Sequence, residues 1–240
     1  MRAPAAAVVG LALAGCGEQA AAPAVAPPRE AFAVAAEERR GTEGGFVTAA
    51  VKRRAALRAS PGGRVVARIG TRTEFGSRRV LAVTGRRDGW LRVIATERPN
   101  GRPAWLRASA ARVSSTNVWI RVDRSRRQLT LRRGDRVLRR VPVAVGRPGT
   151  PTPLGRFAVT DRLRSQRSDS PYGCCAIALS GHQTKLLPGW PGGDRLAIHG
   201  TPNPETVGQA ASLGCMRAGA ADIRALMRRV PLGAVVVVAP

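Results

Sequence analysis

Ile198-His199-Gly200-Thr201 and Ser212-Leu213-Gly214-Cys215-Met216-Arg217 are the two stretches that decide how this 240-residue chain is interpreted. They place an imidazole, a thiol and a guanidinium close together in the sequence. A cysteine is a useful nucleophile only as its thiolate, which at neutral pH usually needs an imidazole or a helix N-terminus beside it. The chain has two histidines, so the candidate bases are His182 and His199.

The residues around this pair predict how it is presented. Residues 195–198 have the pattern of a buried strand, which leaves His199 at the end of the strand and lets Gly200 approach other backbone closely. Beyond Cys215, apolar residues recur at helical spacing, so we expect the thiol in a turn that leads into an amphipathic helix. Backbone N–H groups in such a turn lower the pKa of a thiol and hold a developing oxyanion. The alternative is a buried structural cysteine near an unrelated histidine.

The combination of H-G-T, a loop and S-x-G-C-x-R resembles the signature of the L,D-transpeptidase catalytic domain, also called the YkuD domain. Residues 146–157 resemble the upstream segment of that family, which contains T-P-x-G-x-[FY]. Residues 171–173 and 178–180 resemble its middle portion. The resemblance extends from residue 116 to residue 240, about half of the chain.

The resemblance implies a role for each matching residue. Cys215 would be the nucleophile and His199 its base, with the Gly200 carbonyl as partner of the far imidazole nitrogen. Arg217 would anchor the substrate or order the site. The residues expected to bind substrate are Arg217, Ser212, Gly214 and Tyr172. Leu213 stands where many members have histidine, which removes a possible polar support but leaves the proposed base in place.

The implied activity is that of a peptidoglycan L,D-transpeptidase, a cysteine-dependent acyltransferase of cell-wall cross-linking. The thiol forms a thioester with a donor stem peptide and passes it to an acceptor amine; attack by water instead would make the protein an L,D-carboxypeptidase. This chemistry needs neither metal nor cofactor.

Three other functions stay open. Leu213 leaves room for a non-catalytic peptidoglycan-binding lipoprotein. A thiol redox protein would use Cys215 with the adjacent Cys174 and Cys175, which the alternation of a strand would place on opposite faces. A zinc site could draw on these cysteines and the two histidines, although no C-x-x-C spacing supports it.

The N-terminal residues predict export. Met1-Arg2, a short apolar run and Leu13-Ala14-Gly15-Cys16 resemble a bacterial lipoprotein signal ending in a lipobox. Residues 1–15 would be removed and Cys16 acylated, which would anchor the protein to the outer face of the cytoplasmic membrane, facing the periplasm or cell wall. An ordinary cleaved signal is the alternative. The Ala- and Pro-rich residues 16–45 have few large apolar side chains and are expected to form a tether.

Residues 46–113 predict a small all-β barrel, because short apolar runs alternate with turn residues. Trp90 and Trp105 are expected to pack in its core or against its turns, the alternative being a platform for a ligand. The segment resembles the bacterial SH3-like domain, a family associated with wall peptides. Its expected strands are 51–58, 64–69, 79–83, 90–94 and 103–106.

Residues 116–240 also predict a β-rich domain, expected as a mainly antiparallel sandwich with one helix after the nucleophile. The helix is expected at 220–229. The expected strands are 118–123, 128–132, 136–145, 155–161, 176–179, 196–199 and 234–239. The fold class is therefore mainly β throughout.

Charge is the remaining strong feature of the composition. The chain has 40 basic and 15 acidic residues, a net charge of +25. Such a charge favours contact with anionic polymers such as teichoic acids or with acidic lipid head groups. A compositional bias towards arginine would explain it equally well. Nucleic acid is not expected as a partner, because only 4% of the residues are aromatic and no nucleic-acid-binding motif is present.

Overall fold

A computed structural model describes residues 45–167 and 169–240, which form two β-sheet units. The expected lipobox, the acylation site Cys16 and most of the tether lie outside the described residues. Within the described part of the chain, no helix is long and apolar enough to cross a membrane.

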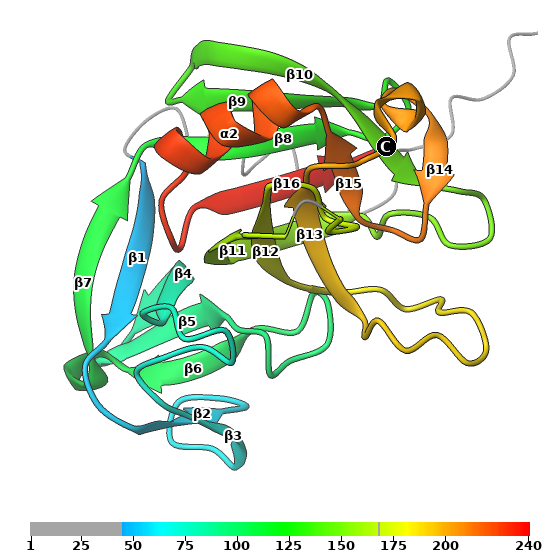
Figure 1. Cartoon of the computed structure of the whole chain (residues 1–240). Helices are drawn as coiled ribbons and strands as arrows, with labels where there is room; N and C mark the ends of the chain where they lie inside the picture. Colours follow the sequence, from blue (N-terminus) through cyan, green and yellow to red (C-terminus); the bar gives the residue numbers. More distant parts are fainter. Residues whose placement is uncertain (1–44, 168) are drawn as a thin grey trace, which may run out of the picture.

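The first unit is a curved, seven-stranded antiparallel sheet with the order β3-β2-β6-β5-β4-β1-β7 (Figure 1). Its elements are β1 (Phe46–Val51), β2 (Ala55–Arg58), β3 (Val65–Ile69), β4 (Val80–Arg87), β5 (Trp90–Ile94), β6 (Ala104–Arg107), the 3₁₀ helix η1 (Ala108–Ala110) and β7 (Ala111–Thr116). The single strand expected at 51–58 was wrong, because the exposed Lys52, Arg53 and Arg54 interrupt it. Trp90 is buried in the unit, as expected, and Trp105 is half-buried.

The second unit is a nine-stranded sheet that closes on itself. Its elements are β8 (Val118–Asp123), β9 (Gln128–Arg133), β10 (Arg136–Gly146), β11 (Gly155–Arg164), β12 (Cys175–His182), β13 (Arg195–His199), η2 (Pro204–Thr206), β14 (Ala210–Ser212), β15 (Met216–Ala218), α2 (Ala220–Arg229) and β16 (Val235–Ala239). The order is β14-β10-β15-β13-β12-β11-β16-β8-β9, and β9 pairs again with β10. The expected sandwich is therefore a closed barrel, because the β9–β10 hairpin joins its two sides.

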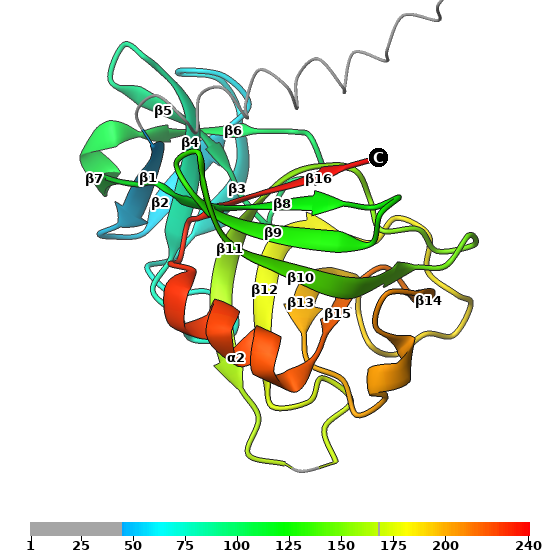
Figure 2. The same ribbon diagram turned by 90° about the horizontal axis from the view of Figure 1, so that it is seen from above.

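Helix α2 has the bounds that its apolar spacing predicts (Figure 2). Its buried Ile223 and Leu226 join the same core as Leu196 and Ile198 of β13. The short strands β14 and β15, which the sequence did not reveal, lie on either side of β10. The packed core thus holds β13 and β15, the strands beside the candidate nucleophile, in fixed positions.

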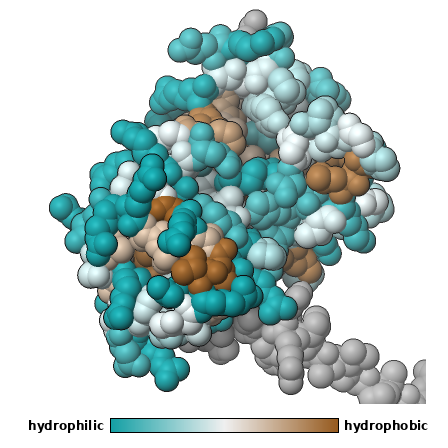
Figure 3. Space-filling model, turned by 90° about the horizontal axis from the view of Figure 1, so that it is seen from below, coloured by the Kyte–Doolittle hydropathy of each residue, from teal (hydrophilic) through white to brown (hydrophobic). Residues whose placement is uncertain are grey.

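The two units share a small apolar core at their junction. Phe46, Ala82 and Ile94 of the first unit pack against the outer face of the barrel at Trp119 and Val237. The face seen from below is mostly hydrophilic, with hydrophobic side chains gathered in separate spots (Figure 3). The junction therefore buries apolar surface that each unit alone would expose.

Candidate active site

The thiol and the imidazole lie on neighbouring strands of the barrel. β13 and β15 run parallel, with Ile198 opposite Met216 and His199 opposite Arg217. Ile198 and Met216 are fully buried in the core. Because side chains alternate along a strand, His199 and Arg217 emerge on the opposite face. Cys215, one residue before β15, lies beside Ala197 on that same face.

His199 is buried, with 4% of its surface exposed. Its Nδ1 lies 2.5 Å from the Gly200 carbonyl oxygen. Because a carbonyl only accepts hydrogen bonds, Nδ1 carries the proton and Nε2 keeps a free lone pair. Burial lowers the pKa of His199 to about 4, and the Arg217 charge adds to this effect although the Gly200 hydrogen bond opposes it. The imidazole is therefore a neutral base at neutral pH.

The Cys215 side chain is half-buried, and its thiol donates to the Arg195 carbonyl at 3.7 Å. Burial raises the pKa of this thiol, whereas the Ala197 N–H and the Arg217 charge lower it by smaller amounts. Among the described residues, Cys215 and His199 share no hydrogen bond. The resting thiol is thus neutral and hydrogen-bonded to the first residue of β13 instead of to the imidazole.

The expected turn into a helix was wrong for Cys215. The residue precedes β15, and α2 begins only at Ala220. The helix N-terminus therefore does not lie beside the sulfur. The reason is that residues 216–218 pair with β10 and β13, although their short apolar pattern does not distinguish a strand from a turn.

Tyr172 and Arg217 flank the imidazole. The ring of Tyr172 meets that of His199 edge-on, with 5.0 Å between centroids, and 44% of the tyrosine is exposed. Arg217 is half-buried and forms no ion pair within residues 45–167 and 169–240. The face beside the thiol therefore offers one aromatic edge and one guanidinium without a carboxylate partner.

Ser212 and Gly214 shape the turn before the thiol. The Ser212 hydroxyl donates to the Cys215 carbonyl at 2.6 Å and accepts from the Gly214 N–H at 3.0 Å. Gly214 has a φ of +123°, a conformation that favours glycine. The hydroxyl of Ser212, which is 1% exposed, is therefore engaged with the turn itself.

Three further residues, none of which was predicted as a site residue, hold this turn from outside. Gln183, 6% exposed, donates through Nε2 to the carbonyls of Leu213, Thr150 and Pro151 at 2.8, 3.3 and 3.2 Å. The hydroxyls of Thr150 and Thr152 donate to the Ser212 and Gly214 carbonyls at 3.2 and 2.8 Å. Leu213, the departure from the usual pattern, is thus bound through its backbone. The T-P motif pointed towards the threonines, but nothing pointed towards Gln183.

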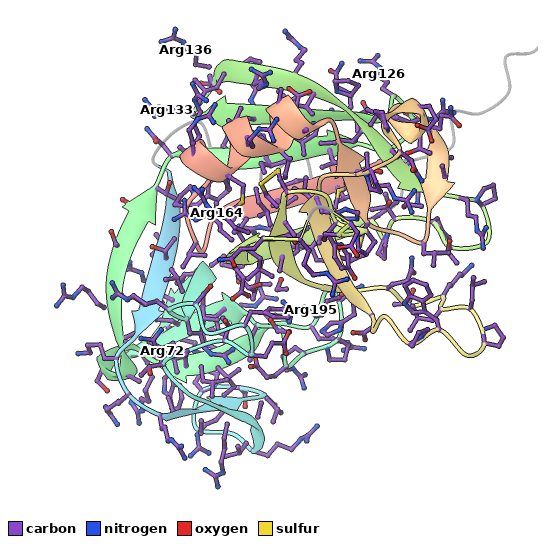
Figure 4. The ribbon with its side chains drawn as sticks, viewed as in Figure 1. Arg72, Arg126, Arg133, Arg136, Arg164 and Arg195 are labelled. Atoms are coloured by element: carbon purple, nitrogen blue, oxygen red, sulfur yellow. A yellow bond between two sulfur atoms is a disulfide. The ribbon has the colours of Figure 1, made fainter. Side chains whose placement is uncertain are left out.

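The first unit contacts the loop end of the β12–β13 hairpin, where His182 pairs with Arg195. The Asn100 side chain donates to the His182 carbonyl at 2.6 Å and accepts from its N–H at 2.9 Å. The His182 ring nitrogens bond the Thr96 carbonyl and the Asp194 carboxylate, so both are engaged at the junction. Arg195, at the junction of the units in Figure 4, pairs with Glu74. The first unit therefore holds both His182, the neighbour of Gln183, and Arg195, whose carbonyl accepts from the thiol.

Cys174 and Cys175 form a disulfide next to the imidazole. The Cys175 carbonyl accepts from the Gly200 N–H at 3.0 Å. The alternation expected for the two cysteines fails because β12 begins only at Cys175, which leaves Cys174 in the preceding turn. Within the described residues, Cys215 is the free cysteine, and no group of three His, Cys, Asp or Glu side chains could hold a metal ion.

Comparison with known proteins identifies the second unit. Residues 117–238 match the sequence model of the L,D-transpeptidase catalytic domain, YkuD. The chain is 34% identical over 114 residues to the YkuD protein of Bacillus subtilis (strain 168) and 33% identical over 121 residues to that of Bacillus licheniformis. These matches cover 48% and 50% of the chain and 61% and 65% of the relatives, less than two thirds of their length.

Solved structures resemble the chain more distantly. An L,D-transpeptidase from Mycobacterium smegmatis is 17% identical, with a TM-score of 0.41 over 60% of this chain and 76% of that one. Another from Mycobacterium tuberculosis H37Rv is 19% identical, with a TM-score of 0.44 over 57% and 64%. Because the family model spans half of the sequence, the chain belongs to the L,D-transpeptidase (YkuD) family.

Proposed function

We propose that this protein is a peptidoglycan L,D-transpeptidase that uses Cys215 as nucleophile and His199 as base. The observation that carries the proposal is the pairing of His199 Nδ1 with the Gly200 carbonyl on the face that also presents Cys215. This pairing leaves Nε2 free to take a proton. Family membership supplies the class of reaction.

The reaction starts from a neutral thiol and a neutral imidazole. Rotation about the Cα–Cβ bond of Cys215 moves the sulfur from the Arg195 carbonyl towards Nε2 of His199. His199 takes the thiol proton as the sulfur attacks the carbonyl carbon of the L,D amide. The same proton goes to the departing amine of the D-amino acid, which leaves a thioester at Cys215.

An acceptor amine then attacks the thioester carbonyl and gives a proton to His199. The carbon–sulfur bond breaks, the new amide leaves, and His199 returns the proton to the sulfur. Transfer to the side-chain amine of a second stem peptide makes a cross-link. Transfer to water makes the protein an L,D-carboxypeptidase, the alternative outcome of the same thioester.

Arg217 and Tyr172 are proposed to bind the donor peptide. Arg217 lies opposite His199 and has no carboxylate partner in the described residues, so it suits a carboxylate of the stem peptide. The exposed Tyr172 ring offers an apolar wall beside the imidazole. Ser212 and Gly214 contribute by fixing the turn that presents the sulfur.

A mass measurement tests the nucleophile. Incubation of the purified protein with a carbapenem is expected to add the mass of one inhibitor molecule, and Cys215→Ala is expected to add none. His199→Gln should form the adduct at least about tenfold more slowly, because the base is missing. An adduct of equal yield on Cys215→Ala would refute the proposal.

Product analysis distinguishes the two enzymes from the non-catalytic alternative. A tetrapeptide-bearing muropeptide should yield a dimer if the protein is a transpeptidase. Release of the tripeptide alone would identify a carboxypeptidase. Neither product, with the muropeptide still bound, would indicate a peptidoglycan-binding protein.

We propose that the protein acts outside the cytoplasmic membrane, anchored through acylated Cys16 and extended on the tether. The first unit is proposed to be SH3-like and to lie near anionic wall polymers. Cys16→Ala is expected to move the protein from the membrane fraction to a soluble exported fraction. A wild-type protein found in the soluble fraction would contradict the anchor while leaving the catalytic proposal intact.

A further inference from the structure

The first unit has three basic hollows around one short segment, residues 52–56. The largest, about 630 Å³, is lined by four arginines, Arg53, Arg54, Arg58 and Arg107. A second, about 580 Å³, shares Arg54 with it and adds Arg68. The two hollows meet along residues 54–56, which line both.

The third hollow begins at the neighbouring Lys52 and measures about 430 Å³. Its other basic residues are Arg72, Arg78 and Arg112. Arg72 lies on the first unit in Figure 4. No acidic residue of segments 45–167 and 169–240 lines any of the three basic hollows. Nine cations thus lie in or around a segment of five residues.

The acidic residues of the unit are engaged elsewhere. Residues 46–113 include 16 basic and 3 acidic residues. Glu74 pairs with Arg195, Asp88 with Arg87 and Glu97 with Arg79. Within the described part of the chain, none of the nine cations forms an ion pair. The described residues therefore leave this charge uncompensated, and it is concentrated at one place.

We infer that the basic hollows bind a flexible phosphodiester polymer. Eight of the nine cations are arginines, whose guanidinium groups fit phosphate oxygens with two parallel hydrogen bonds. Hollows that share one segment can accept successive charges of a single chain. These cations line hollows and not a flat surface, which suits a polymer chain better than a bilayer. Binding here is independent of the reaction proposed at Cys215.

The same hollows do not favour nucleic acid. Their aromatic residue, Trp90, is 7% exposed and lies under Arg107, with 4.3 Å between the guanidinium carbon and the ring centroid. Single-stranded nucleic acids bind mainly by stacking bases on exposed aromatic rings above a basic groove. The hollows therefore provide charge without a stacking platform.

Binding of a fluorescent poly(glycerol phosphate) chain tests the inference. The double variant Arg53→Gln/Arg54→Gln is expected to weaken binding by about tenfold and to reduce the salt slope, log Kd against log salt, by between about one and two. Both side chains are exposed, so folding should be unaffected. The matched control is Arg133→Gln/Arg136→Gln, which removes the same charge from the exposed end of the β9–β10 hairpin (Figure 4).

A change of less than about threefold in the control would support a localised site. Equal losses in both variants would overturn it, since net charge alone would then attract the polymer. Tighter binding to anionic lipid vesicles or to a single-stranded oligonucleotide of equal charge would also overturn it. Cys215→Ala should bind the polymer like the wild type. Polymer binding can therefore succeed or fail independently of the catalytic proposal, and the two failures are distinguishable.

Discussion

Asn100 closes two hydrogen bonds on His182, one to each backbone group of that residue. Asn100 belongs to the first unit, and His182 is the last residue of β12 in the second. The next residue, Gln183, holds the carbonyl of Leu213 in the turn before Cys215. A hydrogen-bonded path therefore links the first unit to the candidate nucleophile.

Asn100→Ala should slow the reaction of Cys215 although the residue is not in the site. Loss of two hydrogen bonds, each contributing about 1 kcal/mol, loosens the end of β12 and the position of Gln183. We expect carbapenem acylation to fall by about fivefold. Asn117→Ala is the control, because Asn117 is exposed and its side chain has no hydrogen bond within the described residues. Equal acylation rates in both variants would rule out the path.

Gln183→Leu should destabilise the turn before Cys215 more strongly than Asn100→Ala does. The substitution leaves the Leu213, Thr150 and Pro151 carbonyls without their donor in a buried place. We expect a loss of about 1 to 3 kcal/mol in the free energy of unfolding, measured by urea denaturation. Gln209→Ala, which removes one exposed hydrogen bond to the Glu205 carbonyl, should lose less than about 1 kcal/mol.

Gly214→Ala should disrupt the same turn from its other side. A Cβ at this position would overlap the amide nitrogen of Gln183, and the φ of +123° is strained for any other residue. We expect a loss of about 1 to 3 kcal/mol in unfolding free energy and slower acylation. At Gly149 an added Cβ meets nothing within 4 Å, so Gly149→Ala is the matched control. If both variants melt at the wild-type temperature, the turn is not fixed in this way.

His199 makes stability depend on pH in a defined window. Its pKa is lowered from 6.5 to about 4. Between these pH values, His199 is therefore protonated in the unfolded chain and neutral in the folded protein. The contribution of His199 to the free energy of unfolding, up to roughly 3 kcal/mol, is present above pH 6.5 and is lost as the pH falls to about 4. Chemical denaturation of the wild type and His199→Gln should therefore converge as the pH falls through this window. Parallel curves would contradict a buried neutral imidazole.

The sequence predicted most of the barrel because its strands alternate clearly or are continuously apolar. Helix α2 was found at its true bounds, since Ile223, Leu226 and Met227 repeat at helical spacing. The closure of the sheet was missed, because it depends on β9 pairing with strands on both sides, which no local pattern records.

The sequence predicted the two stretches that carry the candidate site, but not the residues that hold them in place. H-G-T and S-x-G-C-x-R identify His199 and Cys215 because their chemistry is local. Gln183 and Asn100 act through backbone carbonyls far away in the sequence, so nothing in their own neighbourhood distinguishes them. The charged residues Lys52 to Arg54 were visible in the sequence. That they separate two strands could be recognised only from the pairing of β1 with β7, which ends at Val51.

The disulfide between Cys174 and Cys175 has a consequence for the maturation of the protein. Because the sulfurs of Cys174 and Cys175 are bonded to each other, neither is a free thiol, and Cys215 is the free cysteine of the described residues. In an oxidising compartment, this arrangement removes two free thiols with which the proposed nucleophile could otherwise be oxidised to a disulfide. The neighbouring pair would thus preserve the reactive group while the polypeptide matures.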